Sequence, residues 1–205
     1  MTNDMFLKER TEKRADKAAG QAGWLDGESL EMVRLYSGHF LGLIAGKPAA
    51  PHVPGGDLPE CGAKAPKWPL PTDLVSGNEF LGDEWVYDPA IHGRIIATDL
   101  DRDAVRCANH LIAGHTKAFL ALTDRRLAVV IEQGDIAGES GVGKLLGRFG
   151  KDKPEEEADE KLVTWWQIAR PDVGKVAYGR HYAQRRWFST FHFPDGSVLE
   201  IRHPG

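Results

Sequence analysis

The hydrophobic periodicity of this chain changes along its length, and that change limits the folds it can adopt. Up to about residue 46, apolar side chains recur at steps of three and four residues, the spacing of one face of a helix. Further along, short segments alternate between apolar and polar residues, as half-buried strands do. The sequence therefore predicts an α+β protein in which a helical segment precedes a β-domain.

Two helices are expected in the N-terminal segment. Residues 5–19 are rich in Lys, Glu, Arg and Ala, which favour helix, and Gly20 is a plausible stop. A second helix is predicted for residues 28–45, which place one apolar stripe near a single face: Leu30, Val33, Ser37, Leu41 and Ile44. This stripe lacks the dense basic face of a membrane-surface helix, so packing on protein is the preferred interpretation.

Residues 47–71 contain seven prolines, a density incompatible with a regular helix or a central strand. We expect an extended connector there. The predicted organisation is a helical segment over residues 1–46, a proline-rich connector over 47–83 and a β-domain over 84–205.

Two hairpins are expected in the β-domain. Strands at residues 117–122 and 126–132 are separated by three residues, Thr123-Asp124-Arg125. Residues 186–193 are predicted to form a strand in which Trp187, Ser189, Phe191 and Phe193 share the inner face and Thr190 faces outward. The strand returns through Pro194-Asp195-Gly196. Two more strands are predicted at 163–169 and 175–182, and a short helix at 101–113.

The first hairpin resembles a known family. Residues 119–130, with the letters FLALTDRRLAVV, are similar to the strand–LTxxRL–strand hairpin of bacterial pleckstrin-homology-like (PH-like, GRAM-related) domains. The segment Trp166-Gln-Ile-Ala and the last hairpin extend the resemblance over about the C-terminal half. It implies a PH-like antiparallel β-barrel with a binding role and no shared catalytic residue.

The resemblance also implies a C-terminal helix that closes one end of the barrel. The predicted last strand runs almost to Gly205, so that helix has no sequence to form it. An open barrel end would expose apolar surface. The expectation is that the predicted helix at 28–45 packs on the barrel and covers this end.

Charge and composition narrow the function. The formal net charge is −4, so no global electrostatic reason favours nucleic acid as a partner. Cys61 and Cys107 stand far apart, without the ligand spacing of a zinc site, and the histidines show no H-x-x-x-H pattern. No secretory signal is evident, so a cytoplasmic location is expected. No metal, cofactor or catalytic residue is predicted, and the chain is not expected to be an enzyme.

A glycine-rich loop offers one alternative. Residues 138–144, GESGVGK, match the spacing G-x-x-x-x-G-K of a phosphate-binding loop. The position that needs a magnesium-binding hydroxyl is Leu145, and no βαβ context follows. A flexible connector is preferred over a nucleotide site.

Basic residues gather near the C-terminus. The candidate ligand-binding set is Arg170, Lys175, Arg180, Arg185 and Arg186. Such a surface could hold an anionic lipid headgroup or an acidic protein surface. The preferred interpretation is the solvent-exposed face of a sheet, because outward strand positions must be polar. Arg125 and Arg126, the only basic pair at the first hairpin, are too few to predict lipid.

The function expected from the sequence is a non-enzymatic binding or scaffold module of PH-like type. A protein partner is the first expectation, and an anionic ligand the second. One alternative is a nucleotide-binding protein acting through residues 138–144. The other is an assembly subunit that oligomerises through its N-terminal helices.

Overall fold

The structure is a computed structural model that describes residues 3–77, 83–136, 161–179 and 185–203. Its helices are α1 (Asn3–Gly20), α2 (Ala22–Leu25), α3 (Asp73–Ser76) and α4 (Asp103–Ala113), with short 3-10 helices η1 (Glu84–Tyr87) and η2 (Gln133–Asp135). Its strands are β1 (Leu30–Leu35), β2 (His39–Ile44), β3 (Lys47–Ala49), β4 (Ile91–Ala97), β5 (Phe119–Thr123), β6 (Arg126–Glu132), β7 (Leu162–Ala169), β8 (Asp172–Tyr178), β9 (Arg186–His192) and β10 (Val198–Arg202). The predicted α+β class and the N-terminal helix are confirmed.

The chain forms two compact units, each built around one sheet. The four-stranded unit combines residues 1–36, 56–66 and 110–170. The six-stranded unit combines residues 37–55, 67–109 and 171–205. Each unit thus contains three segments that are separate in sequence. The expected division at residues 46 and 83 follows chain order instead, and it stays a prediction.

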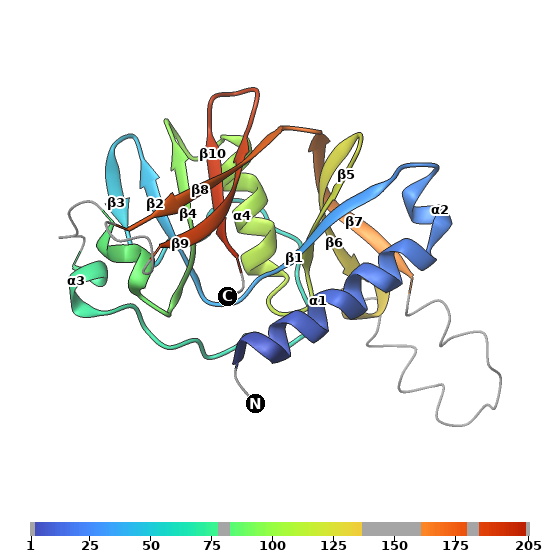
Figure 1. The fold of residues 1–205 in the computed structure, drawn as a ribbon, viewed down its shortest axis with the longest axis horizontal. Helices are drawn as coiled ribbons and strands as arrows, with labels where there is room; N and C mark the ends of the chain where they lie inside the picture. The colour runs from blue at the N-terminus through green and yellow to red at the C-terminus, as the bar shows by residue number, and fades with distance from the viewer. Residues whose placement is uncertain (1–2, 78–82, 137–160, 180–184, 204–205) are drawn as a thin grey trace. The chain divides into compact units, whose positions relative to one another are not determined.

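The sheet of the four-stranded unit is antiparallel, in the order β1-β5-β6-β7. Helix α1 lies across one of its faces (Figure 1). Ala18 of α1 is fully buried against inward residues of the strands, among them Val33, Phe119 and Val130. Lys17 and Arg14 of α1 both form ion pairs with the Glu132 carboxylate at the end of β6. The apolar side of α1 therefore belongs to the core of this unit.

The first predicted hairpin is confirmed by β5 and β6. Thr123 ends β5, and its hydroxyl accepts hydrogen bonds from the backbone N–H groups of Arg125 (3.2 Å) and Arg126 (3.0 Å). The Asp124 carboxylate accepts one from the Ser29 N–H at 2.8 Å. A hydroxyl that binds nearby backbone in this way defines the turn locally, whereas the Asp124 bond ties the turn to a residue 95 positions away in sequence. The residues of the LTxxRL pattern thus build their own turn.

The sheet of the six-stranded unit has the order β3-β2-β4-β10-β9-β8. On one face, α3 and η1 bring Val75, Trp85 and Val86 against Leu41 and Phe188 of the strands. The second predicted hairpin is confirmed by β9 and β10. Its turn binds the start of α4, since Asp195 and Ser197 accept hydrogen bonds from the N–H groups of Asp103 (2.7 Å) and Ala104 (3.0 Å).

The predicted helix at residues 28–45 is wrong, because β1 and β2 occupy that segment. Gly38 separates the two strands with φ +108°, and a Cβ atom there would lie 2.6 Å from the Ala90 carbonyl oxygen. That close approach admits only glycine and breaks any helix. β1 buries Val33 and Leu35 at the two-residue step of a strand. The proposed helical cap for the barrel end therefore does not exist.

A closed antiparallel barrel is also wrong, because the described strands form two open sheets. Strand β7 ends one sheet and β8 ends the other, so the chain changes sheets at Arg170-Pro171. Moreover, β2 and β4 pair in parallel. A parallel pair needs a long crossover connection, and the proline-rich stretch lies within it.

The predicted inner face of β9 is only partly right. Phe191 and Phe193 are buried, but Trp187 is 48% exposed and Thr190, expected to face outward, is buried. Strand β9 lies between β8 and β10, and its central residues 188–191 are covered on both faces. Trp187 stands near the start of the strand, beyond this cover. The glycine loop at 138–144 and Arg180 lie outside the described residues.

Candidate anion-binding site

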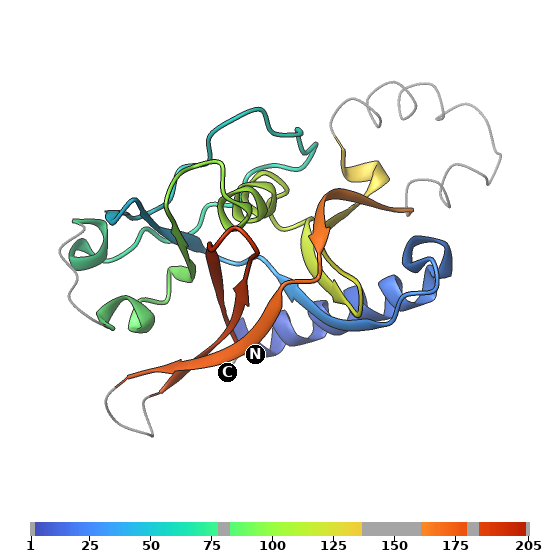
Figure 2. The same ribbon diagram turned by 90° about the horizontal axis from the view of Figure 1, so that it is seen from above.

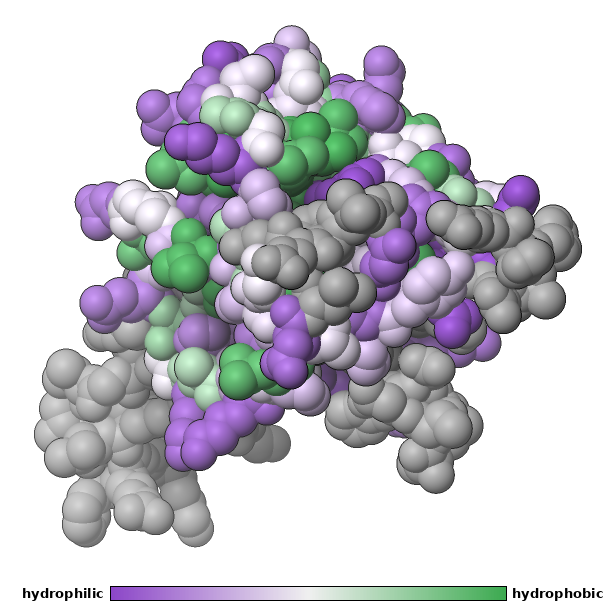
Figure 3. All heavy atoms as spheres, turned by 90° about the vertical axis from the view of Figure 1, so that its left-hand side faces the viewer, coloured by the Kyte–Doolittle hydropathy of each residue, from purple (hydrophilic) through white to green (hydrophobic). Residues whose placement is uncertain are grey.

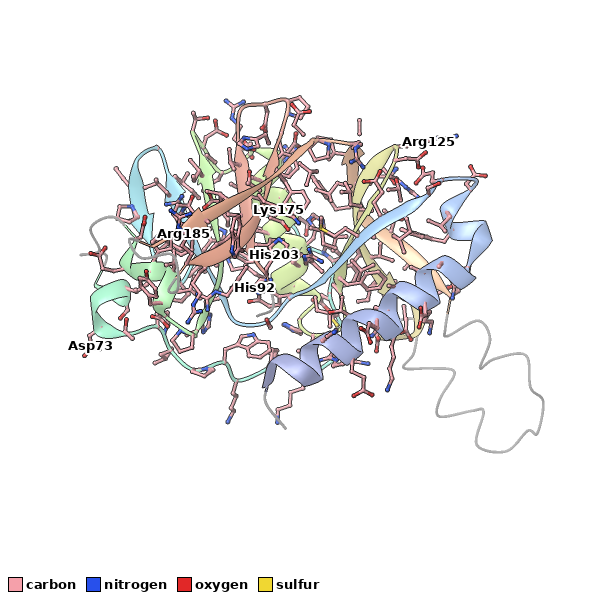
Figure 4. The ribbon with its side chains drawn as sticks, in the orientation of Figure 1. Asp73, His92, Arg125, Lys175, Arg185 and His203 are labelled. Atoms are coloured by element: carbon pink, nitrogen blue, oxygen red, sulfur yellow. The ribbon has the colours of Figure 1, made fainter. Side chains whose placement is uncertain are left out.

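The structure places the candidate basic residues in different surroundings. Arg170 belongs to the four-stranded unit, where its guanidinium pairs with Glu31 at 2.8 Å and donates to the Thr123 carbonyl. Lys175, Arg185 and Arg186 belong to the six-stranded unit and are exposed. Figure 4 labels Lys175, which lies on β8, and Arg185, which directly precedes β9. Arg170 therefore belongs to a different unit from Lys175, Arg185 and Arg186.

The strand register separates Lys175 from Arg186. Lys175 stands opposite Ser189, and Tyr178 stands opposite Arg186. Directly opposed residues share a face of a sheet, and successive residues of a strand alternate between faces. Lys175 and Arg186 therefore lie on opposite faces of the hairpin. The ligand that each residue could bind therefore depends on the other side chains on its own face.

The face of Arg186 holds an aromatic–arginine cluster, defined here as Trp85, Arg94, Tyr178, Arg186, Phe188, Glu200 and Arg202. Its three aromatic rings contact one another, with centroids 5.5 Å apart for Trp85 and Tyr178, 5.1 Å for Trp85 and Phe188, and 5.6 Å for Tyr178 and Phe188. The Arg94 guanidinium carbon lies 4.7 Å from the Trp85 ring centroid and 5.2 Å from that of Tyr178. Aromatic faces attract such a cation.

Arg94 is neutralised within the cluster. Its Nε donates to the Glu200 carboxylate at 2.8 Å, and its terminal nitrogen donates to the Tyr178 hydroxyl at 2.7 Å. The Tyr178 hydroxyl in turn donates to the other carboxylate oxygen of Glu200. Burial and this hydrogen bond to Glu200 raise the pKa of Tyr178, so the phenol keeps its proton. The three side chains join β4, β10 and β8 in one satisfied polar network.

Arg202 is not neutralised in the same way. Its terminal nitrogen donates to the backbone carbonyls of Val86 and Asp88, each at 2.9 Å. Its guanidinium carbon lies 5.8 Å from the Phe188 ring centroid. Burial, followed by the nearby charge of Arg186, lowers the pKa of Arg202. The charge of Asp88 opposes this lowering, so Arg202 lies between one positive and one negative neighbour, and no described carboxylate pairs with its guanidinium directly.

Two buried N–H donors of the cluster lack a partner among the described residues: the indole Nε1 of Trp85 and the Nε of Arg202. The side chains that carry them both contact Phe188. A buried donor left unpaired costs about 1–3 kcal/mol, so native proteins normally satisfy such groups. A negatively charged acceptor that reached either donor would satisfy it and would offset the repulsion between Arg186 and Arg202.

Sequence reasoning missed Trp85 and Arg94 and did not assign a role to Glu200. A signal for two of them was present. Arg94 interrupts the apolar run of residues 91–97, and Glu200 stands between Leu199 and Ile201. Charged residues inside apolar strands are rarely buried unless they are paired. Nothing in the sequence indicated that Trp85 of the short helix η1 would pack over the same strands.

Other polar groups fit structural roles. In the described part of the chain, no group of three or more His, Cys, Asp or Glu side chains is arranged to hold a metal ion. His92 and His203, labelled in Figure 4, contact the hydroxyls of Ser37 (3.2 Å) and Ser189 (2.9 Å). Ser189 is fully buried, which is unsuited to attack on a substrate. Burial raises the pKa of the Cys107 thiol, so this cysteine stays protonated.

Comparison with known proteins leaves the PH-like resemblance as a prediction: no family model and no solved structure matches this chain. None of the helices in the described ranges combines the length and apolar composition that a bilayer crossing requires. The surface seen in Figure 3 carries separate apolar patches between polar side chains over its described residues. The aromatic–arginine cluster is therefore the feature of this molecule that indicates a function.

Proposed function

We propose that this protein is a non-enzymatic binding module whose six-stranded unit recognises a phosphate or carboxylate group of its ligand. The observation that carries the proposal is the pair of unpartnered donors, Trp85 Nε1 and Arg202 Nε, on the face of Arg186. Charge-assisted hydrogen bonds from arginine to such anions are among the stronger polar contacts in proteins. The expected PH-like binding role agrees with this proposal.

Arg186 is the residue best placed to receive the ligand from solvent. It is exposed, and it stands opposite Tyr178 at the end of the β8–β9 ladder. Arg202 and Trp85 lie deeper in the same cluster. We infer that Arg186 draws the anion towards the surface, and that Arg202 and Trp85 then supply directed N–H groups. Arg94 is already held by Glu200 and shapes the aromatic wall.

The Trp85 indole provides a direct test. Its ¹H–¹⁵N resonance, identified by comparison with Trp85→Phe, should move during titration of the full chain with inorganic phosphate. The shift should weaken strongly in Arg186→Gln and persist in Lys47→Gln, which changes an exposed lysine on the distant edge strand β3. Added salt should reduce the response, because it screens exposed charges. An indole chemical shift that does not change on addition of phosphate would contradict the proposal.

Two further titrations distinguish the sources of the anion. A peptide with one phosphoserine, compared with its unphosphorylated form, tests a protein partner. Vesicles of phosphatidylcholine with and without phosphatidylserine test a lipid headgroup. The source of the anion is the probe whose anionic form shifts or broadens the Trp85 signal while its uncharged counterpart does not. This effect should be seen with the native chain and should be absent with Arg186→Gln.

A further inference from the structure

The two edges of the sheet in the six-stranded unit differ in how far they are blocked. Strand β3 forms one edge, and it is three residues long with Pro48 at its centre. Short strands and prolines are devices that prevent another chain from pairing with an edge. Strand β8 forms the other edge over seven residues without proline. Figure 2 shows β8 and β9 running side by side as a hairpin.

Strand β8 pairs with β9 on one side, and no described strand pairs with its other side. An edge of this kind presents a row of backbone N–H and C=O groups. An extended segment can bind such a row through main-chain hydrogen bonds, while alternate side chains supply specificity. Residues 172–178 are long enough to pair with a segment of about seven residues, a typical strand length.

The side chains beside this edge define what such a segment must carry. Lys175 is exposed on the face opposite to the aromatic–arginine cluster. Two residues further along the same face, Ala177 stands opposite Trp187, whose side chain is 48% exposed. Because alanine ends at Cβ, a long apolar side chain placed beside Ala177 can reach across it to the indole of Trp187.

We propose that the outer edge of β8 accepts an extended segment of a partner protein, in which an acidic residue faces Lys175 and an apolar residue two positions away faces Ala177 and Trp187. Either strand direction preserves this spacing, because residues two apart share a face. A second copy of β8 is a poor occupant, since on this face it offers Val173, Lys175 and Ala177, with no acid to meet Lys175.

This proposal does not rest on the proposed anion site. The anion site uses Arg186, Trp85 and Arg202 on one face of the sheet, whereas the edge uses Lys175 and Trp187 on the other. A variant of one surface should leave the other working. The phosphate response of the Trp85 indole therefore serves as an internal control for the experiment on the edge.

The test uses three fluorescein-labelled, blocked heptapeptides and the full chain. The first is Thr-Thr-Glu-Thr-Leu-Thr-Thr, with the acid and the leucine on one face. The second, Thr-Thr-Glu-Leu-Thr-Thr-Thr, has the same composition with the two residues on opposite faces. The third replaces Glu by Lys in the first sequence. Fluorescence anisotropy should show binding of the first peptide and much weaker binding of the other two.

Matched variants assign the contact. Lys175→Glu should weaken binding of the glutamate peptide by about threefold, as expected for an exposed ion pair, and favour the lysine peptide instead. Trp187→Ala should weaken binding by about tenfold, in keeping with an exposed tryptophan anchor at an interface. Lys47→Glu, on edge strand β3, should change nothing. Hydrogen exchange should slow in residues 172–178 when the first peptide binds.

Three results would overturn the proposal. One is that the first two peptides bind equally well, or that neither binds at concentrations up to about 1 mM, where the corresponding binding free energy is only about −4 kcal/mol. Another is protection from exchange elsewhere and not in β8. The third is dimerisation of the free chain that Lys175→Glu alters, which would assign the edge to a second copy.

Discussion

His52 is a buried histidine held by one hydrogen bond between side chains. Its Nε2 lies 2.8 Å from the amide oxygen of Asn109 in α4, and the Asn109 amide nitrogen donates to the Gly55 carbonyl at 3.2 Å. The Asn109 oxygen only accepts, so Nε2 carries the proton. Burial lowers the pKa of His52, and the hydrogen bond to Asn109 opposes this shift less strongly. Burial therefore favours the neutral form of His52 in the folded state.

This burial predicts a pH-dependent stability. The unfolded chain takes up a proton near the ordinary histidine pKa of about 6.5, whereas the folded state resists it. The free energy of unfolding should stay high above that pH and fall as the pH drops through it towards the lower folded pKa. Urea unfolding at pH 7.5 and 5.5 measures the loss, which His52→Gln should reduce. An unchanged pH profile in that variant would assign the loss to other groups.

Gly93 in β4 is required by close packing. A Cβ atom there would lie 2.1 Å from the Glu200 carbonyl oxygen and 2.8 Å from the Phe40 ring. The backbone of β10 cannot withdraw from β4 without loss of their pairing. Gly93→Ala should therefore destabilise the protein by about 3 kcal/mol, the upper range for overpacking. Gly55→Ala, where a Cβ meets nothing within 4 Å, is the control and should stay within about 0.5 kcal/mol. Denaturant unfolding compares the two.

Among the elements, β9 is buried at its centre on both faces. Phe191→Ala removes a fully buried ring and should cost about 3–5 kcal/mol of unfolding free energy. Trp187→Ala, in the same strand, should cost below about 1 kcal/mol, because the exposed indole leaves little cavity. Thermal or urea unfolding of both variants tests this ranking. Similar losses at the two positions would place Trp187 in the core.

The polar network between β4, β8 and β10 is a second property of elements. Glu200 is buried and binds both Arg94 and Tyr178, so Glu200→Ala leaves a partly buried guanidinium without its counter-charge. Breaking such a pair from one side costs about 3–5 kcal/mol. Glu9→Ala, at an exposed pair with Lys13 on α1, should leave the unfolding free energy almost unchanged. The double variant Arg94→Met/Glu200→Leu should recover much of the loss, and additive losses would contradict the pairing.

At the scale of the whole molecule, α1 matters more than the sequence indicates. It buries Ala18 against the four-stranded sheet, and its basic residues bind Glu132. A chain without residues 1–20 should expose Val33, Phe119 and Val130 to solvent. Such a chain should bind a hydrophobic dye and lose amide protection in β5 and β6 relative to the intact protein. Unchanged protection in that shortened chain would contradict a structural role for α1.

Local chemistry accounts for the elements that the sequence predicted correctly. Helix α1 follows from residues of high helix propensity and Gly20. The two hairpins follow from alternating strands joined by short turns, and their turn residues bind neighbouring backbone in the structure. In the candidate site, Lys175, Arg185 and Arg186 could be named from composition. To predict that Lys175 and Arg186 lie on opposite faces, the register of β8 and β9 must also be known. That register depends on where the pairing of the two strands starts.

Contacts between residues distant in sequence decided the rest. The stripe at residues 28–45 fits a helix as well as it fits strands, and the carbonyl of Ala90 next to Gly38 selects strands. The parallel pairing of β2 with β4 requires a crossover that no local pattern encodes. The aromatic–arginine cluster draws on η1, β4, β8, β9 and β10, so its composition could not be read from neighbouring residues. Propensities and turns act within a few residues, whereas sheet order, burial on both faces and shared sites depend on which distant segments can pack together.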